Sequence, residues 1–188
     1  AEAKKEAELA KQAEENAANA PKVTQEERKK QAYKVANQRP KTEAETRFLI
    51  DEQLRMVGWE ADTENIRYSK GVRPTKGRKL AIAEYPTNST VGNRGYADYA
   101  LFIGEKLVGI IEAKAIHKDI PSVIDYQGKD YPRCIREEDE KYVIGKWGEF
   151  KVPFTFATNG RPYLEQYKTK SGIWFLDLRK PDNSPMAL

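Results

Sequence analysis

Apolar residues recur at helical intervals between Leu49 and Val57, and polar residues fill the positions between them. Thr42 precedes this stretch, and Glu45, three positions further on, completes the pattern of a capping box. Gly58 is a residue type that commonly follows the last turn of a helix. The pattern therefore predicts a helix that begins just after Thr42 and ends at Gly58.

Beyond Gly58 the apolar residues gather in short runs separated by loops that contain Gly and Pro. Such runs predict strands, and the run 107–113 is almost continuously apolar, as in a strand covered on both faces. Pro121 suits the first turn of a helix, and Pro132 is expected to kink or end that helix. The predicted elements are an extended segment 64–69, strands 80–85, 97–103 and 107–113, a helix from about 120 to 135, and strands 154–157 and 173–178. This order predicts an α/β domain with helices packed against a mixed sheet.

The first forty residues differ from the rest in composition. Residues 1–20 consist almost entirely of Ala, Glu, Lys, Gln and Asn, and Leu9 is their only large apolar residue. These residue types favour a helix, but they leave no apolar stripe with which the helix could dock. Pro21 ends this stretch, and a second polar helical stretch follows at about 25–38. The chain therefore divides into a charged helical arm, 1–40, and a folded domain, 41–188.

Composition narrows the chemistry of the 188 residues, of which 39% are hydrophobic and 33% charged, with a net charge of +4. A single Cys excludes an internal disulfide framework and a multi-cysteine zinc site, and a single His excludes a histidine-rich metal site. No apolar run reaches the roughly 18 residues that span a bilayer, and the first twenty residues lack a signal-peptide core. We therefore expect a cytoplasmic protein, without membrane contact, whose chemistry rests on carboxylates, lysines and arginines.

Asp98, Glu112 and Lys114 stand on two consecutive predicted strands. Glu112 and Lys114 are two positions apart, so their side chains project from the same face. Converging carboxylates are the ligands of Mg²⁺, and a nearby cation stabilises charge at an attacked phosphate. These residue types thus predict a metal-dependent phosphodiesterase. The alternative is that they merely solvate the end of a strand, and spacing alone leaves both interpretations open.

The register between the two strands can be predicted from the loop that joins them. A three-residue loop, 104–106, pairs Ile103 with Leu107 and so places Asp98 directly opposite Glu112. Directly opposed Cβ atoms lie about 5 Å apart, close enough for two carboxylates to share an ion. A two-residue loop would put them on opposite faces, so the site requires an odd loop or a bulge. Gly104 favours the odd loop.

The loop 70–79 carries five cations and no acidic residue. Such a cluster is typical of segments that contact nucleic-acid phosphates, although a solvated surface loop has the same composition. Arg94, shortly before Asp98, is a weaker second candidate for a phosphate contact. The candidate DNA-binding residues in the loop are Lys70, Arg73, Lys76, Arg78 and Lys79.

Several motifs in fixed order make residues 41–180 resemble a known family. Asp98 with Glu112-Ala113-Lys114 resembles the PD-(D/E)xK nuclease signature. The surrounding sequence resembles the N-terminal nuclease domain of the restriction (R) subunit of type I restriction-modification enzymes. The matching segments are 42–47 (TEAETR), 58–59 (GW), 67–71 (RYSKG), 80–86 (LAIAEYP), 96–99 (YADY), 112–114 (EAK), 119–121 (DIP) and 157–160 (ATNG).

This resemblance implies a restriction-endonuclease-like fold and further site residues. It implies that Asp98 and Glu112 bind Mg²⁺ with help from a glutamate of the first helix, for which Glu43 is preferred over Glu45 because Glu45 belongs to the capping box. It also implies a Gln-x-x-x-Tyr motif at Gln127 and Tyr131, which project from one face of a helix at this spacing. A Gln–Tyr pair of this kind also occurs as an ordinary contact between helix and sheet.

The resemblance further implies Mg²⁺-dependent endonucleolytic cleavage of double-stranded DNA. It also implies assembly with methyltransferase and specificity subunits, and ATP-driven motor domains in a longer polypeptide. Because these 188 residues contain no phosphate-binding Gly-x-x-x-x-Gly-Lys-Ser/Thr loop, we expect ATP to bind outside them. Two other interpretations stay open. One is a stand-alone or repair nuclease of the same superfamily, and the other is a non-catalytic DNA-binding or assembly module with the nuclease fold.

Overall fold

The computed structural model describes residue 27 and residues 43–90, 95–115, 119–124, 128–161 and 165–188. The predicted arm, 1–40, lies outside these ranges except for Glu27, so its structure stays a prediction. Within the described ranges, the helices are all too short or too polar to cross a lipid bilayer.

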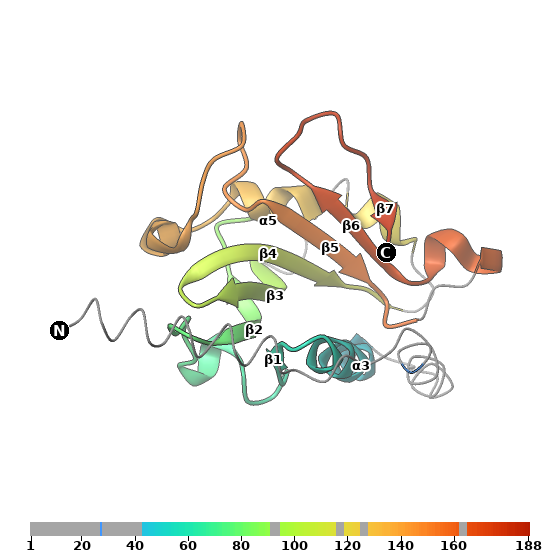
Figure 1. The fold of residues 1–188 in the computed structure, drawn as a ribbon, viewed down its shortest axis with the longest axis horizontal. Coiled ribbons are helices and arrows are strands. Elements are labelled where there is room, and N and C mark those ends of the chain that lie inside the picture. The colour runs from blue at the N-terminus through green and yellow to red at the C-terminus, as the bar shows by residue number, and fades with distance from the viewer. Residues whose placement is uncertain (1–26, 28–42, 91–94, 116–118, 125–127, 162–164) are drawn as a thin grey trace.

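A single mixed sheet forms the centre of the described domain, and the spatial order of its strands follows the chain (Figure 1). The β1–β2 and β4–β5 pairs are parallel, and the other neighbouring strands are antiparallel. The strands are β1 (Glu60–Ala61), β2 (Lys79–Pro86), β3 (Tyr96–Ile103), β4 (Lys106–Ala113), β5 (Phe154–Thr158), β6 (Ile173–Asp177) and β7 (Met186–Ala187). The predicted α/β class with a mixed sheet and flanking helices is confirmed.

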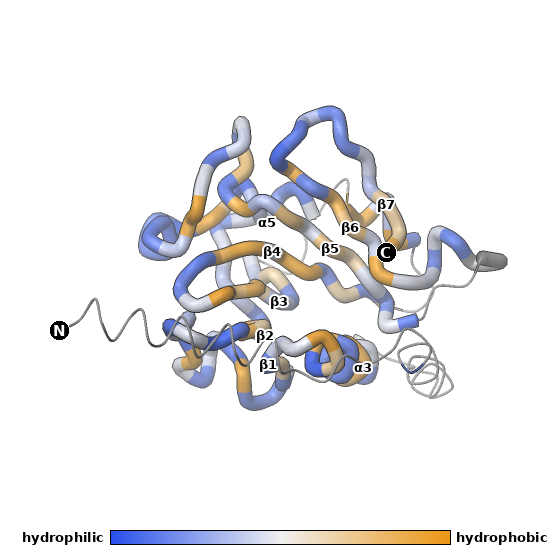
Figure 2. The backbone as a smooth tube through the Cα atoms, viewed as in Figure 1, coloured by the Kyte–Doolittle hydropathy of each residue, from blue (hydrophilic) through white to orange (hydrophobic). Residues whose placement is uncertain are grey.

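Helices cover the sheet because the strands carry apolar residues on both faces, which Figure 2 shows most clearly along β4. Ile50 and Leu54 of α3 pack against one face, where Ala81, Tyr99 and Leu101 lie buried. Residues of α4 and α5 pack against Leu80, Ile110, Leu176 and other core residues. The helices are α3 (Glu43–Met56), α4 (Ile120–Val123) and α5 (Lys129–Arg133), and the 3-10 turns are η1 (Tyr68–Lys70), η3 (Glu137–Tyr142) and η4 (Glu165–Lys170).

The predicted helix after Thr42 and the five predicted strands are confirmed to within a few residues. The predicted extended segment 64–69 is wrong. Its residues form turns and the start of η1, and only Arg67 forms a bridge to a strand, at Ala83. Pro132 lies inside α5, which ends one residue later at Arg133, as its missing N–H donor predicts. The two-residue strands β1 and β7 carry no periodic signal and were not predicted.

The β3–β4 hairpin reaches the predicted register by a different route. Its loop has two residues, because Ile103 pairs with Lys106, so the predicted three-residue loop is wrong. A bulge then shifts the register between Phe102 and Leu101, and Leu101 pairs with Gly109. Because a bulge inserts one residue, it restores the alternation that the even loop would have inverted. Beyond the Tyr99–Ile111 pair, the register carries the next residues, Asp98 and Glu112, to opposed positions.

Candidate functional site

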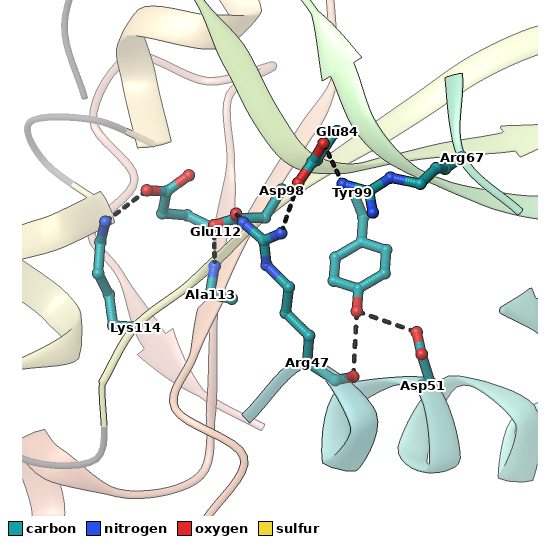
Figure 3. Close-up of polar contacts among 9 residues, drawn as sticks. All are labelled: Arg47, Asp51, Arg67, Glu84, Asp98, Tyr99, Glu112, Ala113 and Lys114. Carbon is teal, nitrogen blue, oxygen red and sulfur yellow. Dashed lines mark hydrogen bonds and ion pairs between the residues drawn. The ribbon is translucent and has the colours of Figure 1, made fainter. Parts of the chain in front are cut away.

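Asp98 is fixed through both of its carboxylate oxygens, as Figure 3 shows. Its Oδ2 accepts a hydrogen bond of 2.7 Å from the backbone N–H of Ala113, at the end of β4. Its Oδ1 lies 2.5 Å from Nη2 of Arg47, which extends from α3. With only 1% of its surface exposed, this carboxylate depends on these protein donors rather than on bulk water.

Glu112 is fully buried beside Asp98, and only one of its oxygens has a partner. Oε1 lies 2.5 Å from Nζ of Lys114, whereas Oε2 has no hydrogen-bond donor among the described residues. Burial and the neighbouring Asp98 raise the pKa of Glu112 to about 8, although Lys114 opposes the rise. Two adjacent acids therefore share an environment with too little positive charge to ionise both easily.

Lys114 directly follows β4, and its backbone N–H donates to the carbonyl of Thr158 over 2.9 Å. This bond extends the β4–β5 pairing beyond Ala113 and holds the lysine beside the strand ends. Its side chain is mostly buried and pairs with Glu112. The structure thus brings Asp98, Glu112 and Lys114 together at one end of the sheet, while their chemical roles stay predictions.

Three further charged residues complete the site, and sequence reasoning missed their roles. Arg47 donates from Nη1 to Oε1 of Glu84 over 2.9 Å while it holds Asp98 through Nη2. Arg67 forms an ion pair with the other oxygen of Glu84. Although burial opposes the shift, these two arginines hold the pKa of Glu84 below its usual value. Arg47, Arg67 and Glu84 lie in segments that carry the family resemblance, but no spacing rule links them.

Hydrogen bonds hold the middle of α3 against β3, next to this site. The hydroxyl of Tyr99 lies 2.9 Å from Oδ1 of Asp51 and 3.1 Å from the carbonyl oxygen of Arg47 (Figure 3). The backbone N–H of Thr63 donates to Oδ2 of Asp51 over 2.7 Å. Because Tyr99 is the neighbour of Asp98 on β3, the same strand positions both the carboxylate and the helix that supplies Arg47.

The other residues predicted from the family resemblance are only partly described. Glu43 is the first residue of α3, but its side chain, like Gln127 and Arg94, lies outside the described part of the structure. Glu45 is exposed on the same helix, so the choice between the two glutamates stays open. Tyr131 is fully buried in α5, in the same core cluster as Ala97, and its predicted role also stays a prediction.

The C-terminal end of the basic loop, at Lys79, lies at the opposite end of β3 from the carboxylates. Lys79 pairs with Ile103, five positions from Asp98, which is about 17 Å along an extended strand. The guanidinium of Arg73 stacks on the ring of Tyr68 at 3.5 Å. The Lys70, Lys76 and Lys79 side chains are exposed, and Arg78 pairs with Glu60. The loop thus runs from η1, which directly follows Arg67, to the far end of β3, and phosphate binding by it stays a prediction.

The described residues fit a divalent cation in one specific respect. No three of their His, Cys, Asp or Glu side chains converge closely enough to hold an ion by themselves. Mg²⁺, however, keeps several waters and is commonly held by one or two carboxylates. The Asp98–Glu112 pair offers this donor set. Oε2 of Glu112 is a buried oxygen that has no hydrogen-bond donor among the described residues.

Comparison with known proteins places the chain in a family. Residues 60–188 match the family described as the second domain of the type I restriction enzyme EcoKI endonuclease subunit. The chain is also 38% identical, over 197 aligned positions, to the type I restriction enzyme EcoKI endonuclease subunit of Escherichia coli strain K12. That alignment covers 89% of this chain and 17% of the relative, so the chain spans about a sixth of that protein's length. No solved structure matches it. The predicted resemblance is therefore confirmed, and the chain belongs to the endonuclease-subunit family of type I restriction enzymes.

Proposed function

We propose that this chain hydrolyses phosphodiester bonds of double-stranded DNA with Mg²⁺, as the nuclease part of a type I restriction system. The observation that carries the proposal is the pair of buried acids, one with a partnerless oxygen, next to the mostly buried side chain of Lys114. A surface that only binds DNA gains nothing from burying two adjacent carboxylates, since phosphates repel them. The name of the E. coli relative, an endonuclease subunit, supports the same activity.

Each residue of the site has a distinct part in this proposal. Asp98 and Glu112 would hold Mg²⁺, with Glu43 as an additional ligand directly or through water. When bound, the ion supplies Lewis-acid polarisation of the phosphate and lowers the pKa of a coordinated water. Lys114 would orient the attacking water or offset the charge that develops on the phosphate, because its amine already lies beside Glu112. Gln127 and Tyr131 would support the surroundings of the metal or the bound DNA.

The proposal extends to the assembly that delivers DNA. The chain spans 17% of its E. coli relative, so ATP-driven motor domains, with their ATP sites, would lie in other parts of a longer polypeptide. Methyltransferase and specificity subunits of a type I complex would be the protein partners, and site choice would rest with them.

Supercoiled plasmid DNA with Mg²⁺ or Mn²⁺ provides the test. Wild-type protein should nick the plasmid, and Asp98→Ala, Glu112→Ala and Lys114→Ala should each lower the rate by about a thousandfold or more. Calorimetry should show that Asp98→Ala abolishes cation binding, whereas Lys114→Ala retains it. Glu60→Ala, which removes an exposed carboxylate at the other end of the sheet, is the matched control and should leave both readouts unchanged.

Two results would contradict the proposal in different ways. If wild-type protein binds DNA but no divalent cation, the chain is a non-catalytic binding or assembly module. If it cuts DNA at full rate without any partner subunit or ATP and shows no association with a restriction complex, a stand-alone or repair nuclease becomes the better description.

A further inference from the structure

Arg47 lies between two carboxylates of the candidate site, those of Asp98 and Glu84. Its guanidinium bridges two carboxylates, with Nη2 at 2.5 Å from Asp98 and Nη1 at 2.9 Å from Glu84. Its side chain is only 16% exposed, so little water competes for these bonds. Arg47 therefore pairs with Asp98, whereas Glu112 pairs with Lys114 through Oε1 and its Oε2 has no hydrogen-bond donor among the described residues.

The backbone of β2 is distorted at the residue that anchors Arg47. Glu84 has a φ of +47°, the only described non-glycine residue in the left-handed region, which costs on the order of 1 kcal/mol or more. Leu80 and Ile82 belong to the core on the α5 side, and Tyr85 rather than Glu84 continues that row. The distortion thus turns the carboxylate of Glu84 away from the core and towards Arg47 and Arg67. Strained residues of this kind concentrate at functional sites.

We propose that Arg47 is an exchangeable counter-ion of Asp98, which a divalent cation must displace, and that Glu84 is the positioning residue that retains it afterwards. This inference rests on the proposed metal-binding function. Both oxygens of Asp98 already accept hydrogen bonds, one of them from Arg47, so a cation that reaches this carboxylate meets a fixed positive charge. Glu84 lowers the cost of displacement because it offers the guanidinium a second carboxylate, itself held by Arg67.

The two residues should therefore affect cation affinity in opposite directions. Arg47→Met removes the competitor and should lower the Kd for Mg²⁺ by about tenfold, a change of roughly 1.4 kcal/mol. Glu84→Gln removes a carboxylate that competes with Asp98 for Arg47 and should raise the Kd several-fold. A purely structural role for this network predicts weaker binding in both variants. Calorimetry with Mg²⁺ alone, on the full chain and without DNA, gives a readout independent of cleavage.

Two additional variants keep the test decisive. Arg47→Lys keeps one charge but cannot bridge two carboxylates, so it should bind Mg²⁺ a few-fold more tightly than wild type even if Arg47→Met does not fold. Arg179→Met, which removes an exposed arginine paired with Asp177 at the end of β6, should leave the Kd unchanged.

The possible failures are distinguishable. If Asp98→Ala abolishes Mg²⁺ binding but neither Arg47 variant binds more tightly than wild type, the counter-ion proposal is overturned while the metal centre stands. If wild-type protein binds no Mg²⁺, the proposed metal centre fails, and the counter-ion proposal fails with it.

Discussion

Two arginine–carboxylate clusters lie in this domain, and adjacent residues of β2 take part in them. Tyr85 belongs to the first, in which its hydroxyl donates to Oδ1 of the buried Asp139 over 2.9 Å. Arg136 donates from Nε to Oδ2 of Asp139 over 2.9 Å and from Nη2 to the hydroxyl of Tyr68 over 2.9 Å. Every oxygen of Asp139 therefore has a donor, and burial with the nearby Asp139 raises the pKa of Tyr85.

Glu84 belongs to the second cluster, in which one carboxylate oxygen has no hydrogen-bond donor among the described residues. Asp98 and Glu112 lie buried side by side, Oε2 of Glu112 has no donor among the described residues, and Glu84 itself is strained. A buried polar group without a partner costs about 1–3 kcal/mol, so a cluster that only stabilised the fold would be expected to resemble the one around Asp139. The difference indicates that the Asp98 cluster is arranged for a ligand rather than for stability.

The largest expected difference between the two clusters is the loss of stability when Asp139 or Asp98 is replaced by asparagine. Asp139→Asn removes the buried counter-charge of Arg136, whose side chain is 18% exposed and keeps only the exposed Glu138 as an ion-pair partner among the described residues, and should lower the free energy of unfolding by about 3 kcal/mol. Asp98→Asn removes one of two adjacent acids, while Arg47 keeps Glu84 as a partner, so stability should change by less than about 1 kcal/mol. Urea denaturation without metal measures both.

If the two substitutions lower the free energy of unfolding equally, the proposed difference between the clusters is wrong. Plasmid cleavage gives the reciprocal readout, because Asp139→Asn should leave the rate per folded molecule unchanged, whereas Asp98→Asn should abolish cleavage. A loss of cleavage in a folded Asp139→Asn protein would assign that cluster a function as well.

The pH dependence of stability provides a second, smaller test. Because the pKa of Glu112 is raised to about 8, the folded protein retains a proton on this group between about pH 4.5 and 8, where the unfolded chain has lost it. The folded state thus binds more protons than the unfolded state, and the free energy of unfolding falls as pH rises through this interval. Glu84, whose pKa is lowered, acts in the opposite direction but below that interval.

Thermal denaturation without metal should therefore show a Tm that declines by several degrees between about pH 5 and pH 8. Glu112→Gln cannot lose this proton and should largely remove the decline, so the variant is more stable than wild type at pH 8. A wild-type Tm that rises over the same interval, or a decline that persists in Glu112→Gln, would place the titrating group elsewhere.

Local sequence patterns were sufficient for the main elements and for the convergence of three site residues. The strand 107–113 and the helix after Thr42 have strong periodic signals, and strand alternation puts Glu112 and Lys114 on one face. The hairpin shows where such reasoning reaches its limit. The pattern allowed an odd loop or a bulge, and the bulge lies beside Gly109, where a Cβ would approach the side chains of Leu101 and Phe156 to 3.2 Å.

The arginine contacts could not be predicted from sequence because they join distant segments. Arg47 and Asp98 are 51 positions apart, and Arg47 and Glu84 are 37 apart, so no helical or strand spacing relates them. Their meeting depends on how α3 packs across the sheet and on the left-handed backbone at Glu84, a conformation that glutamate rarely adopts. The basic loop is the reverse case. Its high charge made it a candidate in the sequence, but charge alone does not predict how far the loop lies from the site.

The exposed pair between Arg78 and Glu60 extends the comparison to a cluster that is neither buried nor strained. Both side chains are 45% exposed, so water and salt screen their attraction, and Arg78→Gln should change the free energy of unfolding by less than about 1 kcal/mol.

The same loop contains Lys79, whose exposed amine has no ion pair among the described residues. If the loop contacts DNA, Lys79→Gln should weaken DNA binding more than Arg78→Gln, because Arg78 must first leave Glu60. Fluorescence anisotropy with a labelled duplex, at two salt concentrations, measures this difference, and equal losses in the two variants would show that the Glu60 pair has no effect on DNA binding.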